Sequence, residues 1–128
     1  ATIAQHGLQA RVQLHGEVTP DALQACYDRA DVFVLPSLHE GYGMALAEAL
    51  ARGLPVLSSR AGAIIDTVPA AAGRLRPPGD GPALRHALAR VLDEPALRAA
   101  LAAGARAART QWPTWAEAAR QFADVLQA

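Results

Sequence analysis

The segment Asp31–Ser58, DVFVLPSLHEGYGMALAEALARGLPVLS, decides the fold of this chain. Residues 31–35 form a short, mostly apolar run rich in β-branched and aromatic side chains, which is typical of a strand buried on both faces. Pro36 cannot donate a hydrogen bond to a sheet, so the predicted strand ends before it. Residues 44–52 predict a helix, and Gly53 is placed to cap its C-terminus.

A second apolar strand is predicted to begin at Val56, just after Pro55. A strand, a loop, a helix and a strand in this order predict a right-handed βαβ unit. Ligands of open α/β sheets bind outside the carboxyl ends of the strands, which is where the loop 37–43 would lie. The loop leads into a helix N-terminus, where free N–H groups and the helix dipole favour phosphate. Gly41 and Gly43 lack a Cβ, so their backbone can approach a ligand closely.

Two carboxylates, Glu40 and Glu48, flank the glycine pair. If both were helical, they would be separated by ~12 Å along the axis, at about 1.5 Å per residue. The paired carboxylates of glycoside hydrolases are roughly 5–10 Å apart, so two separate roles along one extended ligand fit better. Glu40 would reach the group beyond the phosphate, and Glu48 would accept hydrogen bonds from hydroxyls such as those of a ribose.

The pair Glu40-x7-Glu48, with Gly-Tyr-Gly-Met after the first Glu, resembles the EX7E motif of retaining glycosyltransferases with the GT-B fold, in particular family 4. The flanking sequences 30–37 (ADVFVLPS) and 53–58 (GLPVLS) match that family as well. The resemblance extends from about Val12 to Leu126. It implies an α/β fold with a Rossmann-like parallel sheet flanked by helices, which is the C-terminal half of a GT-B enzyme.

The resemblance also implies roles for individual residues. Glu40 is the expected catalytic residue, beside the transferred sugar, and Glu48 is the expected ligand of the nucleotide ribose. The other expected substrate-binding residues are His39, Gly41, Tyr42, Gly43 and Met44 for the sugar and diphosphate, and Gly16, Glu17 and Val18 for the nucleobase. The donor is a nucleoside-diphosphate sugar, which is a substrate, and we expect no cofactor and no metal site.

Residues 1–128 are expected to form a single C-terminal nucleotide-sugar-binding domain. Residues 1–7 resemble the tail of a helix, so we expect an N-terminally truncated domain whose acceptor-binding GT-B partner domain is absent. The parent enzyme would move a hexose from a nucleoside diphosphate to a hydroxyl acceptor with retention of configuration, and the isolated fragment would be inactive. The alternative is a non-catalytic nucleotide-binding or interaction module. A receiver-type module is disfavoured because His15-Gly16-Glu17 lacks an acidic cluster, and a dinucleotide site because Leu46 breaks the GxGxxG pattern.

The composition narrows the possible functions. The 12 basic and 12 acidic residues cancel, which argues against a nucleic-acid or anionic-membrane surface. All 12 basic residues are Arg, so no Lys is available for a P-loop or a Schiff base. A single Cys excludes an internal disulfide. No secretory signal or membrane-spanning run is visible. We therefore expect a cytoplasmic location, with the parent protein at the periphery of the inner membrane as an alternative.

Two further elements are predicted before the central segment. Alternation over residues 11–15 predicts a strand, with His15 at the end that faces the proposed cleft. A capping hydroxyl and a proline predict a helix start at Thr19. The buried stripe of that helix should contain residues at helical spacing, namely Leu23, Cys26, Tyr27 and Ala30. Cys26 is therefore expected in the core, not as a nucleophile.

After Ser59 the chain departs from the family, which usually carries a Gly-Gly and then a Glu. Here one glycine, Gly62, is kept, and Asp66 stands in place of the Glu. Arg60 could pair with a phosphate or lie on the surface. An edge strand is predicted at 73–76, followed by helices that begin near Pro82 and Pro95 and by a final helix that opens with a capping box at Thr114. The second of these three helices contains Gly104, either as a mild cost or as a close packing point. The apolar face of the final helix, from Trp115 to Leu126, is expected to pack on its own domain, and self-association is the alternative.

Overall fold

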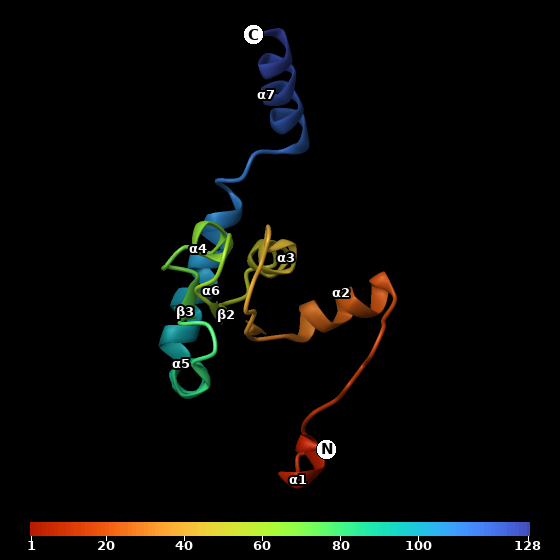
Figure 1. Ribbon diagram of the computed structural model, residues 1–128, viewed down its shortest axis with the longest axis vertical. Helices are drawn as coiled ribbons and strands as arrows, with labels where there is room; N and C mark the ends of the chain where they lie inside the picture. The colour runs from red at the N-terminus through yellow and green to blue at the C-terminus, as the bar shows by residue number, and fades with distance from the viewer.

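The chain forms an α/β domain around a three-stranded parallel sheet, as the sequence predicted (Figure 1). The computed structural model describes all 128 residues. The strands lie in the order β1 (Phe33–Leu35), β2 (Val56–Ser59) and β3 (Gly73–Arg76), and both pairs are parallel. Their carboxyl ends therefore lie along a single edge of the sheet.

Seven helices surround or extend from this sheet. They are α1 (Thr2–Gln5), α2 (Pro20–Arg29), α3 (Met44–Ala51), α4 (Ile64–Thr67), α5 (Gly81–Asp93), α6 (Pro95–Arg109) and α7 (Trp115–Gln127). Helix α3 packs against α6 and both neighbouring strands, whereas α5 packs against β2, β3 and α6. None of the helices is both long and apolar enough to cross a lipid bilayer.

The central strand β2 supplies both halves of the core, since its successive side chains point to opposite faces of the sheet. Val56 joins a cluster with Leu46 and Leu50 of α3, and Leu57 joins a second cluster with Val91 of α5. All four residues of β2 are buried. Strand β1 was expected to be equally buried, but it is an edge strand and its Val34 remains 38% exposed.

The predicted ends of the elements are largely confirmed. The Thr19 hydroxyl accepts a hydrogen bond from the Ala22 N–H at the start of α2. Gly53 follows α3 with a φ of 74°, a left-handed conformation that costs glycine little. Thr114 forms the predicted capping box at α7. Gly104 is a close packing point, because a Cβ there would overlap the carbonyl of Ala71.

The strand predicted at 11–15 is wrong. These residues are exposed and pair with no strand, and they belong to the extended segment that links α1 to α2 in Figure 1. Alternation identifies two faces of a strand, but a strand also needs a neighbour to complete its hydrogen bonds. His15 is consequently at no strand end, and it lies on the exposed linker. Leu23, expected in the buried stripe of α2, is 43% exposed.

The packing predicted for the last helix is also wrong. Helix α7 contains no buried residue, and Figure 1 shows it extending away from the sheet at the C-terminal end of the molecule. Its large apolar side chains are mostly exposed: Trp115 at 92%, Phe122 at 67%, Val125 at 73% and Leu126 at 71%. The helix is specified locally by its capping box, but the connection after α6 does not return it to the core. Self-association through this face stays a prediction.

Candidate functional site

The loop between β1 and α3 lies at the carboxyl edge of the sheet, where a ligand was predicted to bind. Its last residue, Gly43, is buried, has a φ of 82° and is the N-cap of α3. No side chain caps this helix, so its first amides are not occupied by a capping group. A Cβ on Gly43 would lie 3.3 Å from Leu46 Cδ1 and would force a left-handed conformation on an L-residue. Glycine at position 43 permits the left-handed conformation and supplies no capping side chain, so the amides at the start of α3 remain free.

Glu40 is fixed by its main chain and by a neighbouring hydroxyl. Its carbonyl oxygen accepts a hydrogen bond from the Ala63 N–H at 3.2 Å, which ties the loop to the segment after β2. The Ser37 hydroxyl donates to Glu40 Oε2 at 3.3 Å. Gly62, with a φ of 53°, lies against the Glu40 backbone so closely that a Cβ would overlap the Glu40 carbonyl. The half-buried Glu40 side chain thus starts from a well-defined backbone position.

Thr67 of α4 holds the other end of the same loop. Its hydroxyl lies 3.2 Å from the Tyr42 carbonyl oxygen and 3.0 Å from that of Ala63. The side chains of Tyr42 and Met44 nevertheless remain 72% and 67% exposed. The loop therefore combines a fixed backbone with side chains that are free to contact a ligand or a partner.

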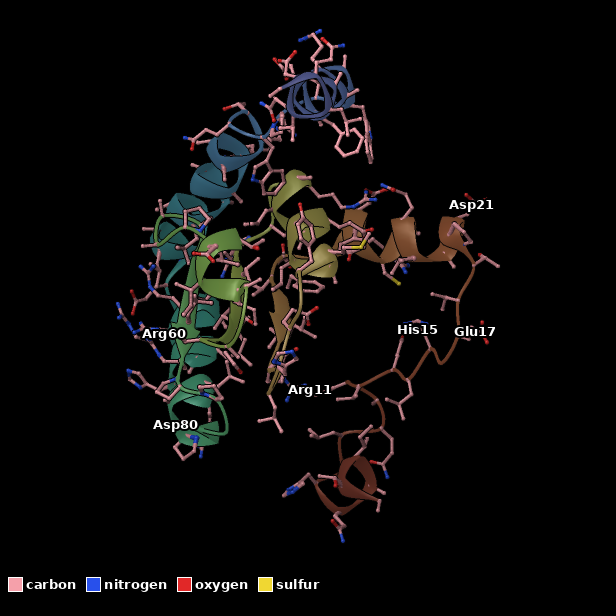
Figure 2. The ribbon with its side chains drawn as sticks, turned by 45° about the horizontal axis from the view of Figure 1, so that its top comes forward. Arg11, His15, Glu17, Asp21, Arg60 and Asp80 are labelled. Carbon is pink, nitrogen blue, oxygen red and sulfur yellow. The ribbon has the colours of Figure 1, made fainter.

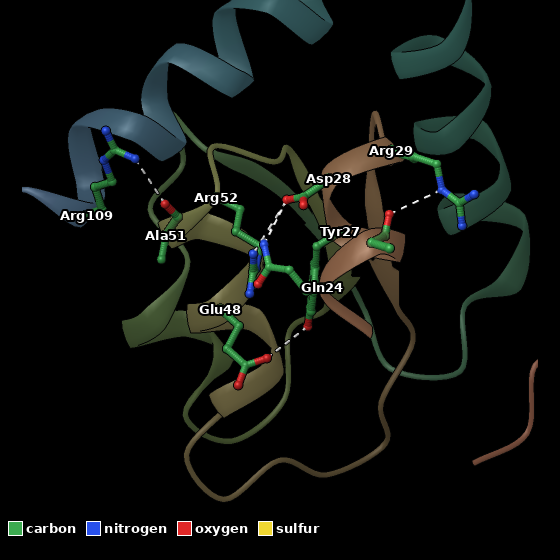
Figure 3. A network of polar contacts seen from close by, with 9 residues as sticks. Gln24, Tyr27, Asp28, Arg29, Glu48, Ala51, Arg52 and Arg109 are labelled. Carbon is green, nitrogen blue, oxygen red and sulfur yellow. Dashed lines mark hydrogen bonds and ion pairs between the residues drawn. The ribbon is translucent and has the colours of Figure 1, made fainter. Parts of the chain in front are cut away.

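Glu48 lies on α3, and a buried tyrosine of α2 positions its carboxylate (Figure 3). The Tyr27 hydroxyl donates to Glu48 Oε2 at 3.2 Å, and Tyr27 itself is only 6% exposed. The guanidinium of Arg52 lies 4.6 Å from the centroid of the Tyr27 ring and pairs with Asp28 at 3.8 Å. Burial and then the neighbouring Glu48 carboxylate raise the pKa of Tyr27, although Arg52 acts against this shift. The tyrosine therefore keeps its proton and donates a hydrogen bond to Glu48.

The two carboxylates share one loop–helix unit, and two cavities lie close to this unit. A cavity of about 610 Å³ on one side of the loop is lined by Tyr42, Asp66 and Thr67 together with Trp112 and Trp115 from the connection to α7 and its first turn. A smaller cavity of about 150 Å³ lies at the ends of the strands. Neither of these two cavities is lined by Glu40 or Glu48. Glu48 lies on the exposed face of α3.

The remaining predicted site residues are dispersed. His39 is exposed in the loop beside Glu40. Gly16 and Glu17 are exposed on the linker before α2, and Val18 is half-buried there. Figure 2 shows Glu17 on the opposite side of the view from Arg60. The nucleobase contacts assigned to this linker stay a prediction.

The segment in which the chain departs from the family forms α4 and the turn before it. Arg60 is exposed, and its backbone N–H donates to the Arg76 carbonyl oxygen at 2.7 Å. Asp66 lies in α4 and lines the larger cavity. The segment thus supports the Glu40 loop through Gly62 and Ala63, whatever Arg60 contacts.

Sequence reasoning missed three residues that shape the site: Tyr27, Gly62 and Thr67. Tyr27 was assigned to the core, and its hydroxyl, which needs a partner when buried, was the available signal. Gly62 was noted as a glycine kept from the family pattern, but its position against Glu40 depends on two segments that are far apart in the sequence. Thr67 carried no signal, because a threonine at the end of a short helix is unremarkable by itself.

Comparisons with known proteins show which family this chain resembles. The model of the family described as "Glycosyl transferases group 1" matches residues 1–108. Among curated relatives, the MMP alpha-(1->4)-mannosyltransferase of Mycolicibacterium hassiacum is 32% identical over 98% of this chain and 31% of its own length. The D-inositol 3-phosphate glycosyltransferase of Xylanimonas cellulosilytica is 37% identical over 94% of this chain and 29% of its own length. The chain therefore spans about a third of the length of these relatives.

Solved structures give the same assignment. Sucrose-phosphate synthase from Thermosynechococcus elongatus superposes with a TM-score of 0.86 at 32% identity, over 98% of this chain and 32% of that chain. Anabaena Alr3699/HepE, solved in complex with UDP, superposes with a TM-score of 0.87 at 26% identity, over 98% of this chain and 34% of that chain. The fold, the EX7E motif and these similarities agree, and the chain belongs to the group 1 family of glycosyltransferases.

Proposed function

We propose that this chain is the donor-binding domain of a retaining glycosyltransferase that moves a hexose from a nucleoside diphosphate to a hydroxyl acceptor. The observation that carries the proposal is the uncapped N-terminus of α3, which Gly43 holds open beside Glu40. The similar Anabaena protein was solved with UDP, which is a nucleoside diphosphate. The donor of this protein is accordingly proposed to be a nucleoside-diphosphate sugar.

The diphosphate would bind at the amides of Gly41 to Met44 and the first turn of α3. These amides combine unpaired N–H groups with the positive end of the helix dipole. The main chain here is already fixed by the hydrogen bonds of Thr67 and Ala63, so binding costs little ordering of the loop. Charge that develops on the leaving phosphate would be stabilised by the same preorganised donors.

Glu40 would lie beside the transferred sugar and bind its hydroxyls. A carboxylate accepts hydrogen bonds only, so it selects the O–H groups of a sugar and holds them in one orientation. Its position is set by the Ser37 hydroxyl and by the backbone bond to Ala63. Positioning of the sugar against the leaving phosphate supplies much of the rate in such a reaction.

Glu48 would accept hydrogen bonds from the ribose hydroxyls of the nucleotide. One of its oxygens is held by Tyr27, and the side chain as a whole remains exposed. Since the chain spans about a third of the length of its relatives, the isolated chain is proposed to bind the donor without transferring its sugar. The full activity belongs to a longer enzyme that contains this domain.

Isothermal titration calorimetry of the 128-residue chain with UDP-, GDP- and ADP-sugars tests the proposal. We expect one base to bind in the micromolar to millimolar range, while the matching nucleoside without phosphates binds at least about tenfold more weakly, because the phosphate contacts are lost. Equal affinity for nucleoside and nucleotide, or no binding by any of the three donors, would contradict a diphosphate site at α3.

Replacing Tyr27 by Phe should weaken nucleotide binding through Glu48. The variant keeps the ring that contacts Phe33 and Arg52 but loses the hydrogen bond to the carboxylate, so we expect a loss of stability of about 1 kcal/mol. If Tyr27 positions Glu48 for the ribose, the preference for UDP over 2′-deoxy-UDP should fall by about threefold. An unchanged preference, measured by calorimetry, would leave Tyr27 a purely structural residue.

The same variant should change how stability depends on pH. The folded-state pKa of Tyr27 is raised above the ordinary value of 10.0, so its contribution is fully present below that pH and is lost as the pH rises through the folded pKa. Urea unfolding at about pH 8 and about pH 11 should show wild type and Tyr27→Phe converging at the higher pH. A stability difference that stays constant between the two pH values would contradict the raised pKa.

A further inference from the structure

A small cavity of about 150 Å³ lies at the carboxyl ends of all three strands, beside the Glu40 loop. Pro36 follows β1, Ser59 ends β2 and Arg76 ends β3, and all three line the cavity. Its other wall is formed by Asp80 and Gly81 at the start of α5. Figure 2 shows Asp80 and Arg60 on the same side of the molecule, away from the linker before α2. The proposed roles of Glu40, Glu48 and the α3 amides leave this cavity unassigned.

The side chain of Ser59 is the first sign of a ligand site. Ser59 is only 5% exposed, and its hydroxyl makes no hydrogen bond to the rest of the chain. Its neighbour Ser58, by contrast, donates to the Leu35 carbonyl oxygen. No fully buried polar side-chain atom in the structure lacks a partner, so the Ser59 oxygen retains some contact with solvent, and Ser59 lines the cavity. A hydroxyl that makes no bond within the chain is available to a ligand that replaces its water.

The charged groups of the cavity are complementary in hydrogen bonding. The half-buried Arg76 forms no ion pair and uses one N–H group on the Leu75 carbonyl oxygen at 3.1 Å, which leaves its other donors free. Asp80 accepts the Ala83 N–H through Oδ1 at 2.9 Å, which leaves its second oxygen free to accept. The cavity thus offers donors and an acceptor with no net charge.

We infer that this cavity is a subsite for a neutral, hydroxyl-bearing sugar group. A sugar hydroxyl both donates and accepts, which matches Asp80 on one side and Arg76 with Ser59 on the other. Apolar side chains in the same lining, Leu38 and Leu84, suit the C–H face of a sugar ring. An anion is disfavoured, because the Asp80 carboxylate occupies the start of α5 and would repel it.

The volume of the cavity agrees with a single sugar group. Pockets for drug-sized ligands measure about 300–1,000 Å³, so a cavity of about 150 Å³ suits a smaller group such as a single sugar ring. The inference rests on the proposed function, which supplies sugars as the ligand class. The ring could belong to the donor or to the acceptor, since both carry the same hydroxyls.

Amide chemical shifts of the ¹⁵N-labelled chain test the inference. The probes are the methyl α-glycosides of glucose, mannose and galactose, then UDP-glucose, UDP alone and inorganic phosphate. We expect at least one sugar-containing probe to shift the amides of Ser59, Gly79 and Gly81 in a saturable manner. A response to methyl glycosides assigns the subsite to a free or acceptor sugar, and a response to UDP-glucose alone assigns it to the donor's sugar. No response to any sugar, or an equal response to phosphate, overturns the inference.

A pair of variants sharpens the result. Ser59→Ala removes one hydrogen bond and should weaken the sugar response by about three- to tenfold. Arg74 shares a face of β3 with Arg76 but lies outside the cavity. The control variant Arg74→Gln should therefore leave the sugar response unchanged. An unchanged sugar affinity in Ser59→Ala would overturn the assignment. The UDP response at the Met44 amide reports on the proposed diphosphate site separately, so a failure there and a failure at Ser59 can be told apart.

Discussion

Replacing Glu40 by alanine in the full enzyme should lower kcat/KM by at least about a hundredfold, the typical effect of removing one preorganised group from a transition state. The variant loses the carboxylate that we place beside the transferred sugar, while the backbone bond to Ala63 remains. Steady-state assays with the donor found by calorimetry would measure the effect. Glu40→Gln, which keeps the shape and removes the charge, should also lose most activity.

Glu94→Gln is the matched control for this variant. Glu94 is a carboxylate at the turn between α5 and α6, where it forms an exposed pair with Arg90 at 2.8 Å. An exposed pair of this kind contributes little to stability, so activity should be retained. Activity of Glu40→Ala within about twofold of wild type would rule out a catalytic role for Glu40.

Gly62→Ala should be the most damaging methyl addition near the site. The new Cβ would overlap the Glu40 carbonyl, and the φ of 53° would itself be strained, for a combined cost of about 2–4 kcal/mol. The Glu40 loop must then move away from α4. Because a displacement of about 1 Å can lower a rate a hundredfold, we expect activity to fall about as far as in Glu40→Ala. Thermal unfolding and steady-state assays together measure both effects.

Gly7→Ala separates backbone strain from steric overlap. Gly7 has a similar φ of 62°, but a Cβ there would meet nothing within 4 Å. This variant should lose at most about 1–2 kcal/mol of stability and no activity. If Gly62→Ala were no more harmful than Gly7→Ala, the contact between Gly62 and Glu40 would not hold the loop in place.

The central βαβ unit could be predicted from the sequence because its signals are local. Pro36 ends a strand and Gly53 ends a helix by their own backbone chemistry, wherever the rest of the chain lies. The same holds for the capping residues Thr19 and Thr114, whose partners lie three residues away. The open start of α3 also follows from local sequence, since Gly43 offers no capping side chain.

The features that the sequence did not predict depend on contacts between distant segments. The alternation at 11–15 resembled a strand, but no neighbouring strand lies beside it to pair with. The position of Glu48 depends on Tyr27, which is 21 residues away on another helix. The apolar face of α7 indicated burial, but amphipathicity does not specify which surface a helix contacts.

If the first amides of α3 bind a diphosphate, amide chemical-shift mapping with UDP will detect the contact at those amides. We predict that the largest shifts fall on Gly43, Met44 and Ala45, and that uridine alone does not produce them. The Gly62→Ala variant should lose the response. Shifts confined to other elements, or equal shifts with uridine, would exclude a diphosphate site at α3.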